Sequence, residues 1–552
     1  MVVLQGFPST MGDDYQLNTT TLIRHAARTY PEQEIVYRRI DGGWDRYTYA
    51  DSYQRMQRLA NALIGVGAEV GDRIGVLDWN SRRHFELYYA VPGMGGVMLQ
   101  LNQRLGLHDL AYVVNHSKAR FLAVDETLLP LAEALAPLAP HVQGWILMSD
   151  RPLAEIPTSL SPVYHYEDLL AEAADSIDWP VIDERSAYGA CYTTGTTGKP
   201  KGVYYSHRSV YLHGMSLANA LSMTMEDGAM LITPMFHGQC WGLPQAVVYA
   251  ASKLVLPGRY TAEDTKPLTD ALVAENVTVT NGAPAIFLPM LRYIETMAEK
   301  PDFSRLRMLC GATEPPLSMM RGFFDLTGAE VIHAYGATET SPLVSMNHFK
   351  PWLRRQLSED DLWDLKRKQG LMLSGVDFQL RGADGQKLPH DGVAVGEICV
   401  RGPWITARYH DMPVTEEQFV NGYWRSGDVG TIDTYGYLKV TDRIKDVVKS
   451  GGEWISSIDM ENALLGHPAV LEAAVVGISH PQWQERPLAL VVLRPGQTAT
   501  QEALKAHLQQ QFMKWQLPDE IVFTDKIART SVGKLDKKAI RDQYANQYQG
   551  AS

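Results

Sequence analysis

The feature of this sequence that most restricts its fold is a repeated alternation of amphipathic helical segments with short apolar runs. Apolar residues recur at helical spacing in Thr20–Tyr30 and again in Tyr49–Gly67. The runs Arg73–Asn80 and Ala119–Glu126 are rich in β-branched or apolar residues, as buried strands are. The same alternation returns between Ala187 and Ala337. Strands that alternate with helices indicate parallel-type sheets covered by helices on both faces, so we expect an α/β fold.

The pattern of residue types along the sequence changes twice after this region. Between Gly375 and Val440, hairpin-like strands are separated by glycine-rich turns, which predicts a small β-rich subdomain. After Asp442, helical and strand patterns mix over about 110 residues, enough for a small α+β domain. A chain of 552 residues also exceeds the roughly 250–300 residues that one core supports. We therefore expect an N-terminal domain over residues 1–441 and a C-terminal domain over residues 443–552.

The composition argues against several classes of function. The formal net charge of −12 does not suit nucleic acid as the main partner, which needs a basic face. No apolar run reaches the ~18 residues of a membrane span, and we expect no signal peptide. The cysteines show no metal-ligand spacing, so we expect reduced, mostly buried thiols in a cytoplasmic protein. Cys240 could be reactive, but a small apolar filler is favoured. The cysteines are Cys191, Cys240, Cys310 and Cys399.

The stretch YTTGTTGKPKGV, Tyr192–Val203, concentrates glycine, threonine and lysine after a predicted strand. Glycines let backbone N–H groups approach a ligand, threonine hydroxyls bind oxyanions, and lysines add positive charge. Together these residue types describe a cradle for polyphosphate. The spacing is not that of a Walker loop, which has four residues between its glycines followed by Lys-Ser or Lys-Thr. A polar surface turn is the alternative interpretation.

Together with four later stretches, this loop resembles the signatures of the adenylate-forming superfamily. That superfamily contains acyl-CoA synthetases, adenylation domains of peptide synthetases and beetle luciferases. Within it, Ser450–Val492 resembles the medium- and long-chain fatty acyl-CoA synthetases. The match runs from about residue 20 to residue 542, in the family's order. The later stretches are YGATET (Tyr335–Thr340), GYWRSGDVG (Gly422–Gly430), DRIKDVVKSGGEWIS (Asp442–Ser456) and TSVGKLDKK (Thr530–Lys538).

The resemblance implies a two-step reaction. A carboxylate attacks the α-phosphate of ATP to give an acyl-adenylate and pyrophosphate, and the thiol of CoA then attacks the acyl carbon and releases AMP. The resemblance also implies Mg²⁺ held by Glu339, Thr193 and phosphate oxygens, and hard oxygen ligands suit this ion. Taken alone, Glu339 could be a carboxylate in the first turn of a helix, but the context favours a metal ligand.

The resemblance further implies a nucleotide site assembled from several signatures. Tyr335 would lie along the adenine, Thr338 would contact the α-phosphate, and Asp428 would accept the ribose hydroxyls. A turn-capping role is the alternative for Asp428. Arg443 would reach the ribose or a phosphate, and Glu314, which is unusual at its position, has no assigned role. The expected ATP and AMP contacts are Thr193, Thr194, Gly195, Thr196, Thr197, Gly198, Lys201, Gly311, Ala312, Tyr335, Gly336, Thr338, Asp428, Arg443 and Lys534.

A C-terminal domain that rotates about a hinge at Asp442 is also implied. Lys534 would bridge the substrate carboxylate and the α-phosphate in the first half-step only. Rotation would withdraw it and present a loop that lines the pantetheine tunnel, with Lys449, Gly451, Gly452 and Trp454 as its residues. Trp454 could equally be a packing residue. The lysines that follow Lys534 in the last signature, Lys537 and Lys538, are expected to be solvated or close to CoA.

The segment Pro234–Pro244 carries the information on the acid. The resemblance places His237 beside the reacting carboxyl, with a core histidine as the alternative, and Trp241 where similar fatty acyl-CoA synthetases have a gating indole. Gly238 and Gln239 replace an apolar and a variable residue of that branch, so the acid stays open. The expected catalytic residues are Lys534, His237, Thr193 and Glu339.

Several hypotheses about function follow. The favoured one is a ligase that joins a medium- or long-chain fatty acid to CoA. The alternatives are a CoA ligase for aryl, arylalkyl or short sulfur-containing acids, an enzyme that loads a carrier protein in trans, and a non-catalytic nucleotide-binding protein. A homodimer is expected by analogy alone.

Overall fold

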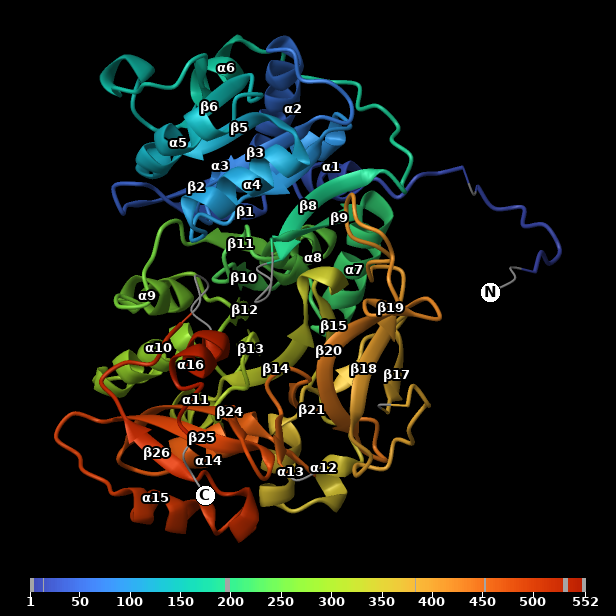
Figure 1. The fold of residues 1–552 in the computed structure, drawn as a ribbon. Coiled ribbons are helices and arrows are strands. Elements are labelled where there is room, and N and C mark those ends of the chain that lie inside the picture. The colour runs from blue at the N-terminus through green and yellow to red at the C-terminus, as the bar shows by residue number, and fades with distance from the viewer. Residues whose placement is uncertain are drawn as a thin grey trace.

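The computed structural model describes residues 4–12, 14–193, 199–382, 384–450, 453–529 and 535–548, which form four β-sheets and the helices that cover them. In Figure 1 the first sheet lies at the top, the second in the middle, the third at the right and the fourth at the lower left. The N-terminal residues extend away from the body as an arm. This arrangement confirms the predicted α/β fold.

The first sheet is parallel except at one edge. It combines the strands β3 and β5, which the sequence predicted, with a final antiparallel hairpin of β8 and β9. Apolar residues alternate along β5 between two hydrophobic clusters, so both faces are covered. In sheet order the strands are β7 (Val163–His165), β6 (Gly144–Met148), β5 (Ala119–Asp125), β3 (Arg73–Leu77), β4 (Val97–Gln100), β8 (Ala187–Thr193) and β9 (Lys201–Ser206).

The second sheet is parallel in its centre and antiparallel at both ends. In sheet order its strands are β16 (Leu371–Met372), β15 (Leu343–Met346), β14 (Glu330–Gly336), β13 (Arg307–Cys310), β12 (Val279–Gly282), β10 (Gly228–Met230), β11 (Lys253–Leu256), β1 (Glu34–Arg38) and β2 (Trp44–Thr48). The strands β10, β11, β12 and β13 had been predicted within the alternation between Ala187 and Ala337, whereas β1, β14 and the antiparallel strands β2, β15 and β16 had not.

Helices form one shared layer between the two sheets and two outer layers. The shared layer, which belongs to the largest hydrophobic cluster, contains α1 (Thr20–Thr29), α2 (Tyr49–Gly65), α3 (Arg82–Gly93), α7 (His207–Ala220) and α8 (Leu243–Tyr249). The outer face of the first sheet carries α4 (Leu107–Ser117) and α5 (Leu129–Leu135), and that of the second carries α9 (Lys266–Ala274), α10 (Pro284–Thr296) and α11 (Leu317–Thr327). The remaining N-terminal helices are α6 (Tyr166–Glu172), α12 (Leu353–Gln356) and α13 (Glu359–Arg367).

The third sheet is antiparallel throughout, as the hairpin-like strands and glycine-rich turns of the sequence predicted. Its strands are β17 (Asp377–Arg381), β18 (Gly396–Arg401), β20 (Tyr423–Ile432), β19 (Phe419–Val420) and β21 (Leu438–Arg443), the last of which pairs with β20. Because β21 runs through Asp442 to Arg443, both residues belong to this sheet.

The fourth sheet follows directly and is covered by its own helices, with separate hydrophobic clusters on its two faces. Its strands are β23 (Glu453–Ile455), β22 (Val448–Ser450), β25 (Gln484–Leu493), β24 (Val470–His480) and β26 (Glu520–Phe523). Its helices are α14 (Ser457–Leu465), α15 (Gln501–Leu508) and α16 (Lys537–Gln543). Separate cores on the C-terminal side of Asp442 suit a domain that moves as a unit.

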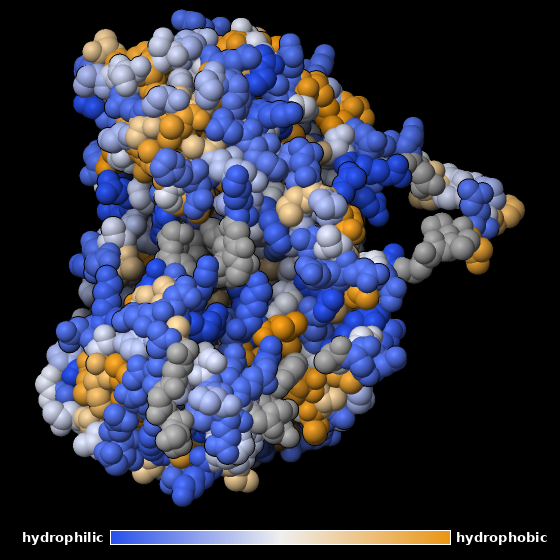
Figure 2. Space-filling model, in the orientation of Figure 1, coloured by the Kyte–Doolittle hydropathy of each residue, from blue (hydrophilic) through white to orange (hydrophobic). Residues whose placement is uncertain are grey.

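The surface and the interior agree with the composition. Figure 2 shows a face that is mostly hydrophilic, with hydrophobic residues in scattered patches. All four cysteines are buried and free. Within the described ranges, every helix is too short or too polar to cross a bilayer.

Candidate active site

The predicted phosphate loop connects β8 to β9, the antiparallel hairpin at the edge of the first sheet. Thr193 ends β8 and pairs with Lys201, which begins β9, and the Lys201 N–H donates to Thr193 Oγ1 at 3.4 Å. The hairpin thus holds a hydroxyl and an ammonium group at the two bases of the loop. Several predicted residues lie outside the described ranges, as does the side chain of Trp454; they are Thr194, Gly195, Thr196, Thr197, Gly198, Gly451, Gly452 and Lys534.

Two residues from different strands, Tyr335 and Arg443, converge on the carboxylate of Asp428. The hydroxyl of Tyr335, near the end of β14, donates to Asp428 Oδ2 at 2.6 Å. Arg443 lies opposite Asp428 in the pairing of β20 with β21, and its Nε is 3.3 Å from Asp428 Oδ1. A carboxylate has about four lone-pair sites, so Asp428 can still accept two further donors. Burial, followed by the charge of Asp428, raises the pKa of Tyr335, which keeps this phenol protonated as a donor.

Glu339 is the second carboxylate of the site and is half-buried. It lies in the short 3₁₀ turn η5 (Thr338–Thr340), and its Oε1 accepts a 2.7 Å hydrogen bond from Tyr409. Trp424 Nε1 donates to the Tyr409 hydroxyl at 3.2 Å, and Lys201 Nζ lies 4.8 Å from the Tyr409 ring centroid. Burial raises the pKa of Glu339, while Tyr409 and Lys201 act in the opposite direction. Tyr409 had no role in the sequence prediction.

Glu339 and Thr193 supply the donor types that Mg²⁺ prefers. In the described part of the chain, no group of three or more His, Cys, Asp or Glu side chains gathers as a metal site. Proteins usually hold Mg²⁺ with one or two carboxylates together with substrate phosphates. A half-buried carboxylate is stabilised by a cation that arrives with such phosphates, so this pair of oxygen donors fits the ion.

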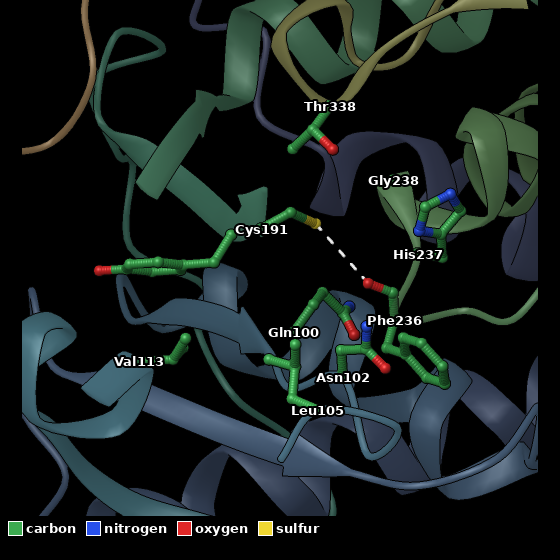
Figure 3. A pocket seen from close by; sticks show the side chains of 10 residues that line it. Gln100, Asn102, Leu105, Val113, Cys191, Phe236, His237, Gly238 and Thr338 are labelled. Atoms are coloured by element: carbon green, nitrogen blue, oxygen red, sulfur yellow. Dashed lines mark hydrogen bonds between the residues drawn. The ribbon is translucent and has the colours of Figure 1, made fainter. Parts of the chain in front are cut away.

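A pocket between the two sheets brings together His237, Thr338 and the end of β8. Figure 3 shows Cys191 at its centre, with Thr338 and His237 on two sides and Gln100 and Asn102 below. The Cys191 thiol lies 3.9 Å from the Phe236 carbonyl oxygen, at the limit of a sulfur hydrogen bond. The lining residues are Gln100, Asn102, Leu105, Val113, Cys191, Tyr192, Phe236, His237, Gly238 and Thr338.

A left-handed turn follows His237 and sets the direction of Trp241. All five residues of this turn, η4 (Gly238–Gly242), have positive φ, with 50° at Gln239, 51° at Cys240 and 60° at Trp241. Such a conformation costs roughly 1–2 kcal/mol for each non-glycine residue, so other contacts must hold it. The sequence contained no sign of this turn beyond its two glycines.

Two buried asparagines supply contacts that fix the turn and the segment before it. Asn281 Nδ2 donates to the Cys240 carbonyl at 2.8 Å, and its Oδ1 accepts from the Thr233 N–H at 3.1 Å. Asn80 Nδ2 donates to the Thr233 carbonyl at 2.9 Å, and its Oδ1 accepts from the Met235 N–H at 2.8 Å. Each of the two side-chain amides donates one hydrogen bond to the main chain and accepts another from it. Together these bonds hold the strained backbone in place.

The indole of Trp241 lies against Gly311, at the end of the second sheet's central strands. A Cβ added to Gly311 would lie 3.4 Å from the Trp241 ring and 2.9 Å from the Ala334 carbonyl oxygen. Ala312 follows with a φ of 70°. Gly336 is closer still to its neighbours, because a Cβ added to it would lie 1.9 Å from the Pro342 carbonyl oxygen. These glycines allow close approach of chain segments around the predicted adenine position.

Two other residues that the sequence left open have structural partners. Glu314 is buried and pairs with Arg367 at 2.9 Å, which accounts for its unusual position. Burial raises the pKa of the Cys240 thiol to about 12, so this cysteine is an inert filler rather than a nucleophile. The methionines Met235, Met290, Met319, Met320 and Met346 are all buried in the core.

The expectation for Lys537 was wrong. Its side chain is only 11% exposed, and its Nζ lies 2.8 Å from Glu461 Oε1 and donates to Ser457 Oγ. Ser457 in turn binds Asp442, so this lysine belongs to the structure beside the predicted hinge and is not solvated. Lys449 lies in β22, where its N–H donates to Glu485 Oε2 at 2.9 Å.

Comparisons with known proteins cover almost the whole chain. The family model described as AMP-binding enzyme matches residues 23–410, and the AMP-binding enzyme C-terminal domain matches residues 459–534. A long-chain-fatty-acid–CoA ligase of Thermus thermophilus is 42% identical over 553 residues, covering 99% of each chain. A 3-methylmercaptopropionyl-CoA ligase of Ruegeria lacuscaerulensis is 36% identical, covering 96% of this chain and 98% of the relative.

A solved structure agrees on the fold. The crystal structure of ATP-bound MatB from Rhodopseudomonas palustris matches with a TM-score of 0.81 at 24% identity, covering 96% of this chain and 100% of that one. At this identity the likeness concerns the fold alone. The match of the family model to most of the chain, together with full-length relatives well above 30% identity, shows that this chain belongs to the AMP-binding enzyme family.

Proposed function

We propose that this protein is an ATP- and Mg²⁺-dependent acid:CoA ligase that acts on a medium- or long-chain fatty acid in the cytoplasm. The observation that carries the proposal is the convergence of Tyr335 and Arg443 on the Asp428 carboxylate beside the end of β14, the strand that leads into Glu339. This group offers a ring, a carboxylate and a guanidinium, which are the features that bind an adenosine phosphate.

The first half-step requires that charge developing on the phosphates be neutralised. Lys201, at the base of the phosphate loop, and Arg443 supply positive charge from two sides. Asp428 would accept the ribose hydroxyls through its remaining lone pairs and so fix the nucleotide along Tyr335. Correct placement of the two reactants alone can lower a barrier by roughly 7–11 kcal/mol, so rigid strands are suitable carriers for these side chains.

Thr193 and Glu339 would hold Mg²⁺ together with phosphate oxygens of ATP. The ion would neutralise phosphate charge and orient the α-phosphate. Tyr409 would keep the Glu339 carboxylate oriented through its hydrogen bond. Support for the ion comes from the half-buried position of these two oxygen donors and from their chemistry.

Residues on the two sides of Asp442 would serve the two half-steps in turn. Lys534 would act in adenylate formation, and rotation about Asp442 would then replace it with the loop that contains Lys449, Gly451, Gly452 and Trp454. The separate hydrophobic clusters of the C-terminal sheet support a unit that moves as a rigid body. The domain limits that follow are residues 1–441 and 443–552.

The pocket between the sheets would receive the acid and the thiol. His237 lines it, and Trp241, in the left-handed turn that follows His237, would close the apolar side of the acid site. A fatty acid is favoured because the relative at 42% identity is named for that activity. A short sulfur-containing acid is the second candidate, since a relative at 36% identity is named a 3-methylmercaptopropionyl-CoA ligase and Gln239 is buried in the turn.

A panel of acids tests the proposal. AMP release with ATP and CoA is measured for straight-chain acids of graded length, 3-methylmercaptopropionate and cinnamate, and a carrier protein replaces CoA in parallel. Highest kcat/KM for medium or long chains supports the fatty acid, whereas highest kcat/KM for the thioether acid supports the second candidate. Absence of AMP release with every acid and of pyrophosphate exchange into ATP would refute the ligase itself.

A matched pair of variants tests the assigned nucleotide site. Asp428→Asn removes the charge but keeps the shape, and hydrogen bonds to charged groups contribute roughly 1.5–3 kcal/mol, so KM for ATP should rise at least tenfold. Asp384→Asn, on an exposed turn of the same β-rich region, is the control. Equal KM values for ATP in both variants would remove Asp428 from the site.

A further inference from the structure

A second cavity of about 720 Å³ has walls that share no residue with the pocket of the candidate active site, although Thr406 in its wall donates its N–H to the Glu339 carbonyl at 2.8 Å. It is bordered by Arg73, Val97 and Ala187, which are the first residues of β3, β4 and β8. The phosphate loop follows the other end of β8 and so lies at the carboxyl edge of the sheet, where substrates of α/β folds usually bind. This cavity therefore opens at the opposite edge and shares no residue with the nucleotide site proposed above.

The cavity is strongly cationic in a chain whose net charge is −12. Four cationic side chains line it, namely Arg73, Lys118, Arg185 and Arg408, against a single carboxylate, Asp411. Within the described ranges, no ion pair joins any of these four side chains to a carboxylate. Like charges gathered without counter-ions repel one another, so this arrangement favours an anion that comes from outside.

Arg73 is held in place before any ligand binds. Its Nε donates to the Ser117 carbonyl at 2.6 Å, its Nη1 to the Gly71 carbonyl at 2.8 Å and its Nη2 to the Lys118 carbonyl at 3.2 Å. Carbonyl groups orient the guanidinium but leave its net charge uncompensated. A fixed cation loses little conformational entropy when an anion binds, which increases affinity.

Aromatic rings form another part of the wall. The rings of Tyr204 and His410 are tilted by 37° with centroids 4.4 Å apart, and His410 Nε2 lies 3.5 Å from Asp411 Oδ2. Burial lowers the pKa of His410, and the charges of Arg73 and Lys118 act in the same direction. The field of these cations therefore extends across the cavity to the aromatic wall.

We propose that this cavity binds a phosphorylated small molecule, with Arg73, Lys118, Arg185 and Arg408 neutralising its phosphate groups. Phosphate offers several charged oxygens to several donors at once, which matches a cluster of four cations. The volume lies within the roughly 300–1,000 Å³ of small-molecule sites, so a nucleotide would fit beside the rings. Inorganic phosphate, pyrophosphate and AMP share this chemistry and are the three probes of the test.

The test compares binding stoichiometry in three full-length proteins by isothermal titration calorimetry with each probe. The cavity variant is Lys118→Glu with Arg408→Glu, both of which are exposed residues. The control is Arg355→Glu with Lys514→Glu, which makes the same change in net charge at exposed sites outside the cavity. Because pyrophosphate and AMP can also enter the nucleotide site, the number of equivalents bound is the readout.

We expect the cavity variant to bind one equivalent less of at least one probe than both the natural protein and the control. The probe that loses an equivalent identifies the source of the phosphate group. Equal stoichiometry and affinity in all three proteins, or the same loss in the control, would overturn the proposal. A single Arg185→Glu variant repeats the comparison with the smallest change to the fold, and it should weaken the same probe at least tenfold.

Discussion

The Asp442 carboxylate and Ser457 are joined by two hydrogen bonds, one from the backbone N–H at 2.8 Å and one from the side-chain hydroxyl. Asp442 ends the β-rich sheet and Ser457 begins α14, so this contact fastens the predicted hinge to the C-terminal sheet. Lys537 completes the group by donating to Ser457 and pairing with Glu461. Burial raises the pKa values of Asp442 and Glu461, whereas Lys537 lowers both.

Lys537→Met should therefore destabilise the protein by roughly 3–5 kcal/mol at neutral pH, because it leaves buried carboxylates without their cation. The folded-state pKa values of Asp442 and Glu461 would rise further above their unfolded values. The variant therefore keeps its stability below the unfolded-state pKa values of Asp442 and Glu461, where both carboxyl groups are protonated. It loses this stability as the pH rises through their folded-state pKa values. Urea unfolding of the variant should approach that of the natural protein toward acid pH.

Lys538→Met is the control for this variant, since the neighbouring Lys538 is exposed. It should leave the free energy of unfolding, measured with urea, within about 0.5 kcal/mol of that of the natural protein. If Lys537→Met behaved in the same way at pH 7, the buried ion pairs would contribute nothing to stability.

Tyr409→Phe tests how the orientation of Glu339 affects adenylate formation. The Tyr409 hydrogen bond lowers the pKa of Glu339 against the effect of burial, so its loss should raise that pKa. Since Mg²⁺ needs the ionised carboxylate, the acid limb of the pH profile of kcat/KM for ATP should move to higher pH. Pyrophosphate exchange into ATP, measured across pH at two Mg²⁺ concentrations, gives this profile.

Tyr435→Phe, at an exposed tyrosine, serves as the comparison and should leave the profile unchanged. More Mg²⁺ should partly restore the Tyr409→Phe variant at acid pH, because the ion competes with the proton for Glu339. A uniform loss of activity at every pH would mean that Tyr409 acts only by packing.

Gly311→Ala tests whether the close approach of Trp241 matters for function. The added methyl group would meet the Ala334 carbonyl oxygen at 2.9 Å and the Trp241 ring at 3.4 Å. A backbone oxygen cannot move aside as a flexible side chain can, so Gly311 and Trp241 must shift. We expect kcat/KM for ATP to fall at least tenfold, with a smaller effect on the KM of the acid.

The control for this change is Gly106→Ala, where nothing lies within 4 Å of the added methyl group. That variant should keep its kinetic constants and its melting temperature. Unaltered kinetics in Gly311→Ala would show that the wall formed by Gly311 and Trp241 tolerates displacement.

The parts of the site that the sequence predicted are those built from contiguous residues. The loop rich in threonine, glycine and lysine and the strand before it follow from local composition, whereas Tyr335 was implied by the resemblance of its motif to that of a known family. The position of Arg443 opposite Asp428 depends on the register of β20 with β21, which only the folded sheet reveals. The role of Tyr409 was missed because its partner Glu339 is distant in sequence and tyrosine has no characteristic spacing.

Burial of charge was equally hidden from the sequence. Lys537 lies among lysines in an apparently solvated stretch, and only tertiary contacts with Ser457 and Glu461 show that it is enclosed. The left-handed turn at Gly238–Gly242 is another such case, because Gln239, Cys240 and Trp241 individually disfavour positive φ. Asn281, in β12, and Asn80, between β3 and α3, hold that region and are distant from it in sequence.

Glu167 provides a final prediction, concerning stability rather than activity. Burial alone would raise its pKa, but Arg83, Arg55 and Arg82 outweigh this effect and lower the pKa to about 2. The shift from the ordinary value of 4.5 corresponds to about 3 kcal/mol of stability at neutral pH. Because the folded pKa is depressed, this contribution is present above pH 4.5 and is lost as pH falls toward 2.

Glu167→Gln should therefore reduce the free energy of unfolding at pH 7 and flatten its dependence on pH between about 4.5 and 2. The arginines remain in the variant without their shared carboxylate, so the loss at pH 7 should exceed that of an ordinary surface change. Glu172→Gln, at the exposed end of the same helix, provides the comparison and should keep the natural pH dependence. Parallel pH profiles for the two variants would show that the three arginines do not stabilise the folded state through Glu167.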